Sequence, residues 1–330
     1  MSPRLQGELK REIDGQLVQE ASPLGRFQLE MSETVEQIRL VESPRGAPRS
    51  SAQTAQPLRS VRIGERLASA HYPWPLDGLQ RAAKKLTWTA LEARLVNSPV
   101  RYAVRELLTH RQGDYALRNG ESRFSVRHRS GDIDIFRKFY AYGYYDLPEE
   151  VQARLRSLDR AVNVLDLGAN IGFFEVFTRD RLPIGHVVCF EPDPANAAVL
   201  ERARATNGAD WEIVRACASN RAGTVRFNTG RKNFSRIDAG GDADTPALDV
   251  FGRIAEADLV KMNIEGSEWE ILQDPRLAET SASWIVEYHR IANPTADIHG
   301  HVRELFERAG YSVRLAAKVQ DNGLLWAWKA

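Results

Sequence analysis

The stretch Val162-Asn-Val-Leu-Asp166-Leu-Gly168-Ala-Asn170-Ile-Gly172 decides the fold of this 330-residue chain. It is an apolar strand that runs into a glycine-containing turn, and a helical pattern over 173–181 follows at once. Glycines let the backbone approach a ligand closely, and the first turn of a helix offers unpaired N–H groups. The next strand ends at Glu191, where a carboxylate can accept hydrogen bonds from both hydroxyls of a ribose. Together these features predict an adenosine site.

Apolar strands and amphipathic helices alternate along the rest of the chain. Near-continuous apolar strands separated by helices indicate a mostly parallel α/β sheet that is covered on both faces. The last residues instead predict an antiparallel hairpin at the sheet edge, formed by 311–320 and 324–328 around Asp321-Asn-Gly. The predicted strands are 162–167, 186–190, 211–217, 259–264 and 284–288, and the predicted helices are 173–181, 195–205 and 302–309.

The glycine turn does not fit a nicotinamide dinucleotide site. The dinucleotide fingerprint G-x-G-x-x-G needs its third glycine for close packing of helix on strand. The corresponding positions here are Gly168, Asn170 and Phe173, so two of the three glycines are absent.

Composition sets limits on the partners and on the compartment. Lys and Arg number 45 against 44 Asp and Glu, so no global field favours nucleic acid. Cys189 and Cys217 each lie in an apolar run and suit neither a disulfide framework nor a zinc site, so we expect plain core residues. The start lacks a signal-peptide core, and no stretch has the roughly 18–20 apolar residues that span a bilayer. We expect a cytoplasmic protein, either soluble or bound at the inner face of the membrane.

The N-terminal third is predicted to be an attachment. Residues 1–57 end in a Ser-, Pro-, Ala- and Gln-rich stretch over 43–57, which predicts a mobile tail and linker. Leu5, Leu9, Ile13 and Leu17 recur every fourth residue, so short helices are the alternative there.

Residues 58–112 are predicted to form a helical extension. Apolar residues return at helical spacing from Pro75 to Arg111, and Ser98-Pro99 indicates a second helix start. Basic residues on the polar side fit an anionic membrane surface or a glycan-assembly partner, and packing on the catalytic domain is the alternative. The catalytic domain is predicted over 113–330, opening with a hairpin that turns at Asn119-Gly120.

Four motifs resemble the FkbM-type S-adenosylmethionine-dependent methyltransferases. They are 165–174, 190–194, 259–268 and 286–289, in the order and spacing of that family. The resemblance implies a Rossmann-like class I methyltransferase sheet and S-adenosyl-L-methionine as the cofactor. It also implies the cofactor-binding residues, which are Asp166, Gly168, Asn170 and Gly172 at the methionine and ribose end, Glu191 and Asp193 at the ribose, and Ala218 and Ser219 at the adenine edge.

Two positions of the resemblance stay open. Tyr145 lies in an aromatic lead-in and is predicted to close over the sulfonium by a cation–π contact, with core packing as the alternative. Asn263 stands where the family usually has Asp, which keeps the shape but removes a charge. We therefore expect no metal, and another group must act if the family carboxylate is a base.

Transfer of a methyl group to a hydroxyl needs the acceptor oxygen, the methyl carbon and the departing sulfur in line. It also needs a base with a pKa near the working pH to remove the hydroxyl proton. His289 is predicted to be that base together with Glu287, because two residues at period two share one face of a strand. A capping role is the alternative for His289. Glu265 is a further catalytic candidate, with a helix N-terminal carboxylate as the alternative. The predicted acceptor contacts are Asn233, Ser235 and Glu268.

The predicted reaction is O-methylation of a hydroxyl on a sugar or surface glycan, with no nucleic acid as partner. One alternative is O-methylation of a small natural-product metabolite. The other is a catalytically silent scaffold that binds S-adenosylmethionine, an idea that Asn263 motivates.

Overall fold

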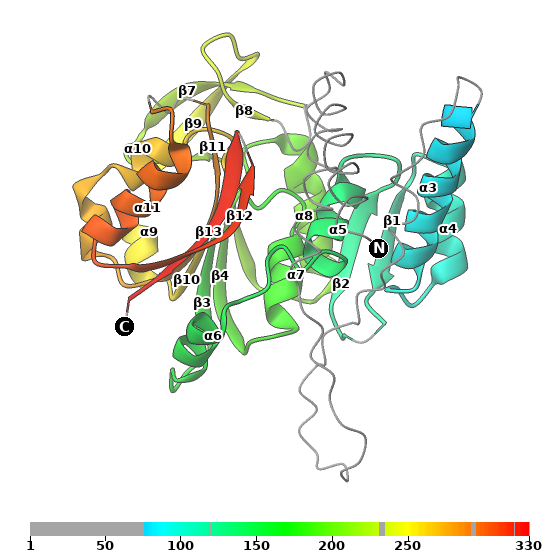
Figure 1. The fold of residues 1–330 in the computed structure, drawn as a ribbon, viewed down its shortest axis with the longest axis horizontal. Helices are drawn as coiled ribbons and strands as arrows, with labels where there is room; N and C mark the ends of the chain where they lie inside the picture. Colours follow the sequence, from blue (N-terminus) through cyan, green and yellow to red (C-terminus); the bar gives the residue numbers. More distant parts are fainter. Residues whose placement is uncertain (1–75, 119, 231–234, 292–294, 320, 330) are drawn as a thin grey trace, which may run out of the picture. The chain divides into compact units, whose positions relative to one another are not determined.

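The computed structural model describes residues 76–118, 120–230, 235–291, 295–319 and 321–329 (Figure 1). These residues fall into two compact units, divided between Trp88 and Thr89. The predicted tail and linker over 1–57 lie outside the described residues, and so does Asn233. Helix α3, Leu76–Ala93, holds all the described residues of the first unit. None of the described helices is both long and apolar enough to span a bilayer.

The predicted pair of helices is confirmed. Helix α4 spans Pro99–Leu108, with the proline in its first turn and Ser98 at the N-cap, although the serine hydroxyl makes no capping hydrogen bond. The predicted hairpin is also present, because β1, Gln112–Ala116, pairs antiparallel with β2, Arg123–Arg127. Asn119 of its predicted turn lies outside the described residues.

The second unit begins at Thr89 and therefore contains α4, ahead of the predicted boundary at 113. Buried polar contacts explain this. Tyr102 on α4 donates a hydrogen bond to Glu92, at 3.1 Å. Arg137 on α5, Asp132–Tyr140, donates to the same carboxylate. These contacts join the end of α3 and α4 to the rest of the unit.

A seven-stranded sheet forms the centre of the second unit, in the order β12-β13-β11-β10-β3-β4-β5 (Figure 1). The five strands from β11 to β5 are parallel, as predicted. The final hairpin is antiparallel, but β13 lies between β11 and the edge strand β12. The strands are β3 Val162–Leu167, β4 Ile184–Phe190, β5 Trp211–Val214, β10 Leu259–Met262, β11 Ser283–His289, β12 Ser312–Val319 and β13 Asn322–Trp328.

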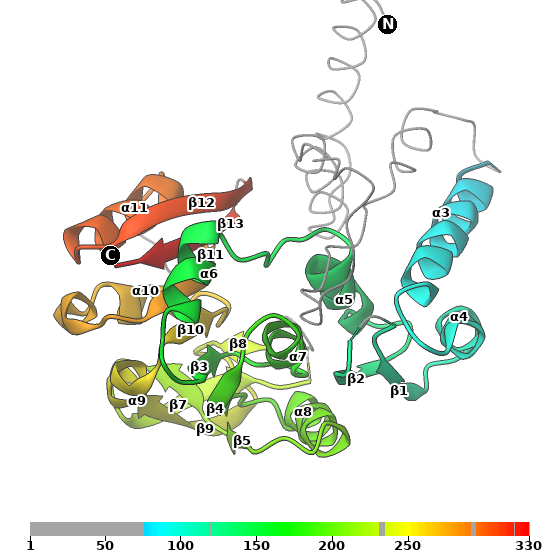
Figure 2. The ribbon, with the colours of Figure 1, turned by 90° about the horizontal axis from the view of Figure 1, so that it is seen from below.

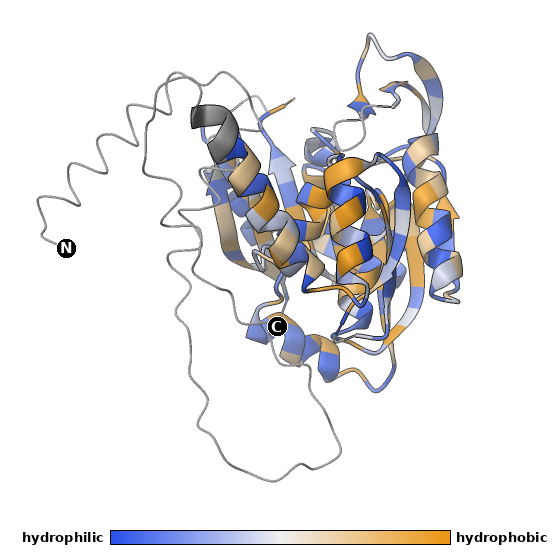
Figure 3. Cartoon of the chain, turned by 90° about the vertical axis from the view of Figure 1, so that its right-hand side faces the viewer, coloured by the Kyte–Doolittle hydropathy of each residue, from blue (hydrophilic) through white to orange (hydrophobic). Residues whose placement is uncertain are grey.

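Helices cover both faces of this sheet (Figure 2). Helices α7, Phe173–Arg179, and α8, Pro194–Thr206, lie on one face. The other face carries α9 Phe251–Glu256, α10 Glu268–Leu272 and α11 Ile298–Arg308. Apolar and polar residues alternate along the helices (Figure 3), which lets each bury one face. A further helix, α6 Glu149–Arg156, precedes β3.

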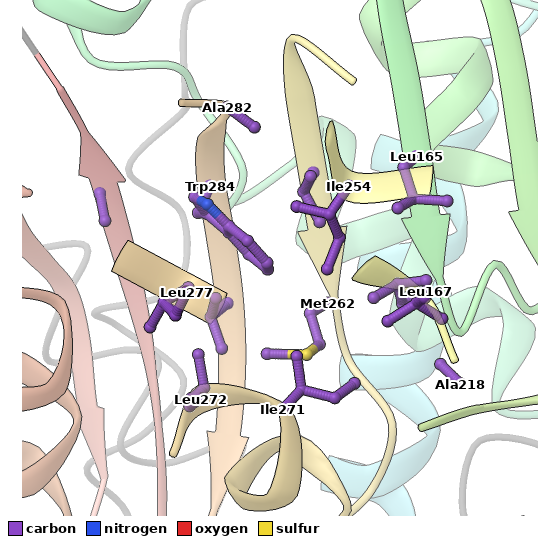
Figure 4. Packing of buried hydrophobic residues seen from close by; sticks show 14 of the residues in the cluster. Leu165, Leu167, Ala218, Ile254, Met262, Ile271, Leu272, Leu277, Ala282 and Trp284 are labelled. Atoms are coloured by element: carbon purple, nitrogen blue, oxygen red, sulfur yellow. The ribbon is translucent and has the colours of Figure 1, made fainter. Parts of the chain in front are cut away.

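One apolar core lies between β3, β10, β11 and the helices of the second face. Leu165, Met262 and Trp284 from the strands pack with Ile254 of α9 and Leu277 of the short 3₁₀ helix η3, Pro275–Glu279 (Figure 4). This core fixes β3 and β10 side by side. The loops that follow both strands therefore emerge together at the carboxyl-terminal end of the sheet.

The predicted strand over 211–217 is wrong in its second half. Strand β5 ends at Val214, where the N–H of Ala216 donates back to the Val214 carbonyl at 3.0 Å and turns the chain. Cys217 then starts β6, which ends at Ser219. Strand β6 joins a separate four-stranded sheet, in the order β6-β9-β7-β8, with β7 Gly223–Asn228, β8 Arg236–Ile237 and β9 Ala243–Asp249. Both cysteines are buried and form no disulfide, as expected.

Candidate functional site

Three residues of the loop after β3 have a left-handed backbone conformation. Gly168, Asn170 and Gly172 have φ values of 84°, 53° and 89°. A Cβ on Gly168 would collide with the carbonyl oxygen of Asn263, and one on Gly172 would lie 2.9 Å from Leu200 Cδ1. The glycines are therefore needed for the packing of the loop itself, in addition to any approach of a ligand.

A buried lysine fixes Asp166 below this loop. Lys261 Nζ lies 2.9 Å from Asp166 Oδ1 and donates to the Gly168 carbonyl. Behind them, burial raises the pKa of Glu175 well above its ordinary value, and the charge of Asp166 adds to this. Cys189 Sγ also donates to Glu175, at 3.1 Å. Asp166 thus pairs with Lys261, and burial favours the protonated form of Glu175 behind them.

Glu191 lies at the end of β4 beside the same loop. Its Oε2 accepts from the N–H of Asn170 at 2.7 Å, and its Oε1 accepts from the N–H of Asp193 at 2.8 Å. Burial raises the pKa of Glu191 to about 8. A carboxylate has about four lone-pair sites, so this one can take two further donors. That capacity fits the predicted pair of ribose hydroxyls.

The environment of Asp193 does not support the predicted cofactor contact of its side chain. Its Oδ1 caps α8 by accepting from the N–H groups of Ala195 and Asn196. Its Oδ2 accepts from the N–H of Gly230 at 2.6 Å and from Ser235 Oγ at 2.7 Å. The acceptor sites are filled by the protein. The hydroxyl of Ser235, a predicted acceptor contact, donates to Asp193, so its contact with an acceptor stays a prediction.

Ala218 and Ser219 lie on β6, both buried. Burial and the nearby carboxylate of Glu191 raise the pKa of Cys217 to about 12. The N–H of Glu191 donates to the Val214 carbonyl at 3.0 Å, and β6 begins three residues after Val214, so the start of β6 lies close to Glu191. The two residues therefore lie on the side of the sheet edge where adenosine was predicted.

Glu287 at the end of β11 is a charged carboxylate with three donors. Lys138 Nζ lies 2.8 Å from its Oε1, Tyr145 donates to its Oε2 at 2.6 Å, and Asn263 Nδ2 donates to the same oxygen at 3.2 Å. Burial alone would raise its pKa, but Lys138 and His289 outweigh burial and lower it to about 2. The predicted part of Glu287 in a base assembly is therefore not supported, because such a carboxylate does not take up a proton near neutral pH.

Tyr145 is held as a packed residue. Its ring stacks on Phe139 with centroids 4.1 Å apart and 9° between the planes, and its side chain is buried. This arrangement favours the packing alternative for the ring, while the hydroxyl orients Glu287.

His289 lies between two carboxylates. Its Nδ1 is 2.9 Å from Glu268 Oε1 and its Nε2 is 3.7 Å from Glu265 Oε2. Burial alone would lower its pKa, but Glu265 and Glu268 outweigh burial and raise it to about 9. A protonated imidazole has no lone pair for a proton. The predicted role of His289 as the base is therefore not supported, and we interpret it as a cation that positions its neighbours.

Glu268 is committed to contacts within the protein, so its predicted contact with an acceptor stays a prediction without support from its surroundings. Its side chain is fully buried, and its carboxylate accepts from the N–H groups of Ile264 and Gly266 as well as from His289. It holds the turn after β10 in place. Within that turn Glu265 has φ 54°, an uncommon value for a residue other than glycine.

Glu265 lies at a surface pocket of about 420 Å³. Burial raises the pKa of Glu265, while His289 opposes the rise. The other residues that line the pocket are Ile237, Gly266, Ser267, Trp269, Glu270, Gln273 and Ile291. Of the three predicted catalytic residues, Glu265 is the one that lines this pocket.

Sequence reasoning missed Lys138 and Lys261. Lys261 was visible as a single charged residue within the apolar run of β10, and a buried lysine requires a partner such as Asp166. Lys138 lies on α5 and meets Glu287 from a distant part of the sequence, so no local spacing marks it. Among the described residues, no group of three or more His, Cys, Asp or Glu side chains is arranged to hold a metal ion.

The methyltransferase FkbM domain family matches residues 166–313. Similar solved structures include a precorrin-6y C5,15-methyltransferase from Geobacter metallireducens, at 16% identity and TM-score 0.35 over 55% of this chain and 86% of that one. A methyltransferase FkbM from Methylobacillus flagellatus is 14% identical, with TM-score 0.37 over 79% of this chain and 63% of that one. No curated protein matches the chain. The family match therefore shows an S-adenosyl-L-methionine-dependent methyltransferase domain over the matched residues. Residues 166–313 belong to the FkbM methyltransferase domain family.

The residues at the carboxyl-terminal ends of the central strands fit this cofactor. Glu191 has acceptor sites for two hydroxyls, and Asn263 Oδ1 is buried with no hydrogen-bond partner among the described residues. A buried orphan acceptor beside Gly168 suits the ammonium group of the methionine part. Gly168, Asn170, Glu191 and Asn263 would hold the cofactor there.

Proposed function

We propose that the chain O-methylates a hydroxyl of a sugar or surface glycan. The observation that carries this proposal is Glu265, a carboxylate of raised pKa that lines a pocket of about 420 Å³. A hydroxyl is a poor nucleophile until its proton is removed, and a positioned base of suitable pKa meets that need.

Glu265 is the base that the surrounding charges favour. Glu287 is too acidic, since its pKa is lowered to about 2. His289 already carries its proton, since its pKa is raised to about 9. Burial moves the pKa of Glu265 upward from its ordinary value, in the direction that improves a base.

S-adenosyl-L-methionine supplies a methyl carbon bonded to a sulfonium, and displacement requires the acceptor oxygen in line with that bond. The chain contributes alignment and proton removal. The turn that carries Glu265 is fixed by Glu268, which accepts two of its N–H groups. The proton of the hydroxyl passes to Glu265, and the pocket connects that carboxylate with solvent.

The lining of the pocket supports a sugar acceptor. Ser267, Glu270 and Gln273 provide polar groups, while Ile237 and Ile291 provide apolar surface. A sugar ring has polar edges and an apolar face, so it matches such a mixture. The volume falls within the roughly 300–1,000 Å³ of small-molecule sites.

A transfer assay tests the proposal. The purified chain is incubated with methyl-labelled S-adenosylmethionine and a panel of neutral oligosaccharides, small hydroxylated metabolites and primary amines. We expect label in alkali-stable methyl ethers of the saccharides, and at least roughly a hundredfold less label with Glu265→Gln. Label on the metabolites alone would show that the acceptor is a small metabolite and not a saccharide. Label on the amines would contradict the proposal that the methyl group goes to oxygen. Cofactor binding without transfer to any cellular glycan fraction would favour the silent scaffold.

A further inference from the structure

The apolar side of helix α4 faces solvent, which is the reverse of the usual arrangement. Val100, Val104 and Leu108 recur every fourth residue on one side of it, and their exposed fractions are 76%, 47% and 72%. The opposite side is buried and carries Tyr102 and Glu106. A surface helix ordinarily turns its apolar stripe to the core. Here the stripe faces outward and a carboxylate faces inward.

The inward carboxylate locks α4 in this orientation. Glu106 Oε2 accepts from the N–H of Arg129 at 2.9 Å and lies 3.2 Å from His128 Nδ1. His128 Nε2 is in turn 2.7 Å from the Tyr115 hydroxyl. Rotating α4 to bury the stripe would strip Glu106 of these partners, and an unpaired buried carboxylate is costly. The exposed stripe is therefore a fixed feature of the surface.

The exposed charges in the sequence around the stripe are mostly basic. Arg101 lies on α4 itself, and Arg111 follows three residues after Leu108. From Thr89 to Gly131, leaving out Asn119, one acidic side chain is exposed, Glu121. The exposed basic side chains of that range, histidine aside, are Arg94, Arg101, Arg111, Arg118, Arg123 and Arg129. The whole chain carries a formal charge of +1, so this region concentrates positive charge.

We propose that α4 docks the methyltransferase on an anionic lipid surface. The stripe of Val100, Val104 and Leu108 would enter the boundary between headgroups and acyl chains. Arg111 would contact lipid phosphates, and so would Arg101, whose guanidinium also donates to the Asp114 carbonyl at 3.2 Å. Nucleic acid offers no apolar layer for the stripe. A second copy would bring like-charged arginines together. An anionic bilayer matches both the apolar stripe and the charge.

Vesicle co-sedimentation with the full chain tests this docking. We expect binding to vesicles of phosphatidylcholine and phosphatidylglycerol, weak binding to phosphatidylcholine alone, and loss of binding as salt rises. The triple substitution Val100→Gln, Val104→Gln and Leu108→Gln should weaken binding on the order of tenfold. Arg101→Gln and Arg111→Gln should each weaken it roughly fivefold.

Matched controls separate docking from folding. Leu248→Gln changes an exposed apolar side chain on β9, and Arg156→Gln changes an exposed arginine on α6, so both should bind vesicles like the wild type. Thermal unfolding and methyl transfer to a soluble acceptor should be unchanged in all variants. Equal binding by the triple variant and the wild type would overturn the proposal. So would a dimer that the triple substitution dissolves, in a chain that binds no vesicles.

Discussion

His289 Nδ1 lies 2.9 Å from Glu268 Oε1, and Glu265 and Glu268 together favour the charged form of this buried histidine. Glu268 is fully buried and also accepts from two N–H groups of the turn that carries Glu265. The pair therefore joins the end of β11 to the turn after β10. It positions Glu265 at the pocket and leaves His289 without a free lone pair.

Replacing Glu265 by Gln should lower methyl transfer by roughly 10²–10⁴-fold, the usual range for a positioned base. Cofactor affinity should stay near that of the wild type, because Glu191 and the glycine loop are untouched. Wild-type turnover should also fall as the pH drops through the pKa of Glu265, since the protonated carboxyl cannot accept the proton. Labelled-methyl turnover against pH and a cofactor titration measure both effects. Unchanged turnover in Glu265→Gln would show that a residue other than Glu265 acts as the base.

Stability should decline in alkali because of His289. Its folded pKa of about 9 lies above the unfolded value of 6.5, so its stabilising contribution is complete below pH 6.5 and is lost as the pH rises through 9. The shift corresponds to roughly 3 kcal/mol. His289→Gln should be less stable than the wild type at pH 6.5, and the difference between the two proteins should shrink as the pH rises to 9.5. Denaturant unfolding across that range measures the difference, and parallel curves for the two proteins would contradict the charged pair.

Local patterns predicted the parts of this fold that depend on neighbouring residues. The apolar run before Asp166 and the glycines after it were sufficient for β3 and its loop, and the end of β4 located Glu191. Alternation also placed Glu287 and His289 on one face of β11. It could not supply their surroundings, because Lys138 reaches Glu287 from α5.

The same limit applies at other positions of the chain. Asp193 looked available because its partners, Gly230 and Ser235, come from a loop after β7 that its own strand end does not reveal. The break after Val214 depends on one backbone hydrogen bond and on a second sheet. Electrostatic roles and the order of the strands required the tertiary contacts, whereas most of the strands and helices followed from local sequence.

Cofactor affinity should rise with pH because of Glu191. Its pKa of about 8 without ligand means that it holds a proton at neutral pH, and accepting two hydroxyls favours the ionised form. Binding should then release a proton, with affinity rising up to about tenfold per pH unit until pH 8. Calorimetry in two buffers of different ionisation enthalpy measures that proton. Glu191→Gln should bind more weakly and without this pH dependence; a wild-type affinity that is flat from pH 6 to 8 would argue against it.

Gly168→Ala should destabilise the chain strongly. The new Cβ would meet the Asn263 carbonyl, and the residue would also have to keep a φ of 84°. We expect a loss of about 3 kcal/mol or more, combining backbone strain with a collision that neither backbone can avoid. Gly208→Ala is the matched control, because its φ is 56° and nothing lies within 4 Å of the new Cβ. That variant should lose only about 1–2 kcal/mol. Equal losses of stability in the two variants would show that the backbone at Asn263 moves away from the new Cβ.

Asn263→Asp should make stability depend on pH in a new way. The amide Nδ2 of Asn263 donates to Glu287 Oε2 at 3.2 Å, and aspartate would replace this donor with a second negative charge. Like charges at that separation raise the pKa of one carboxyl. The folded pKa of the new group would then lie above its unfolded value of about 3.9, so stability relative to the wild type should fall as the pH rises from 4 to 8.

Asn263→Ala is the matched control for that substitution, since it removes the donor without adding charge. It should lose about 1–3 kcal/mol at every pH, the cost of an unsatisfied buried carboxylate site. Thermal unfolding of both variants between pH 4 and 8 distinguishes them. If the Asp and Ala variants follow the same pH curve, the amide of Asn263 does not compensate Glu287, and Lys138 with Tyr145 alone holds that charge.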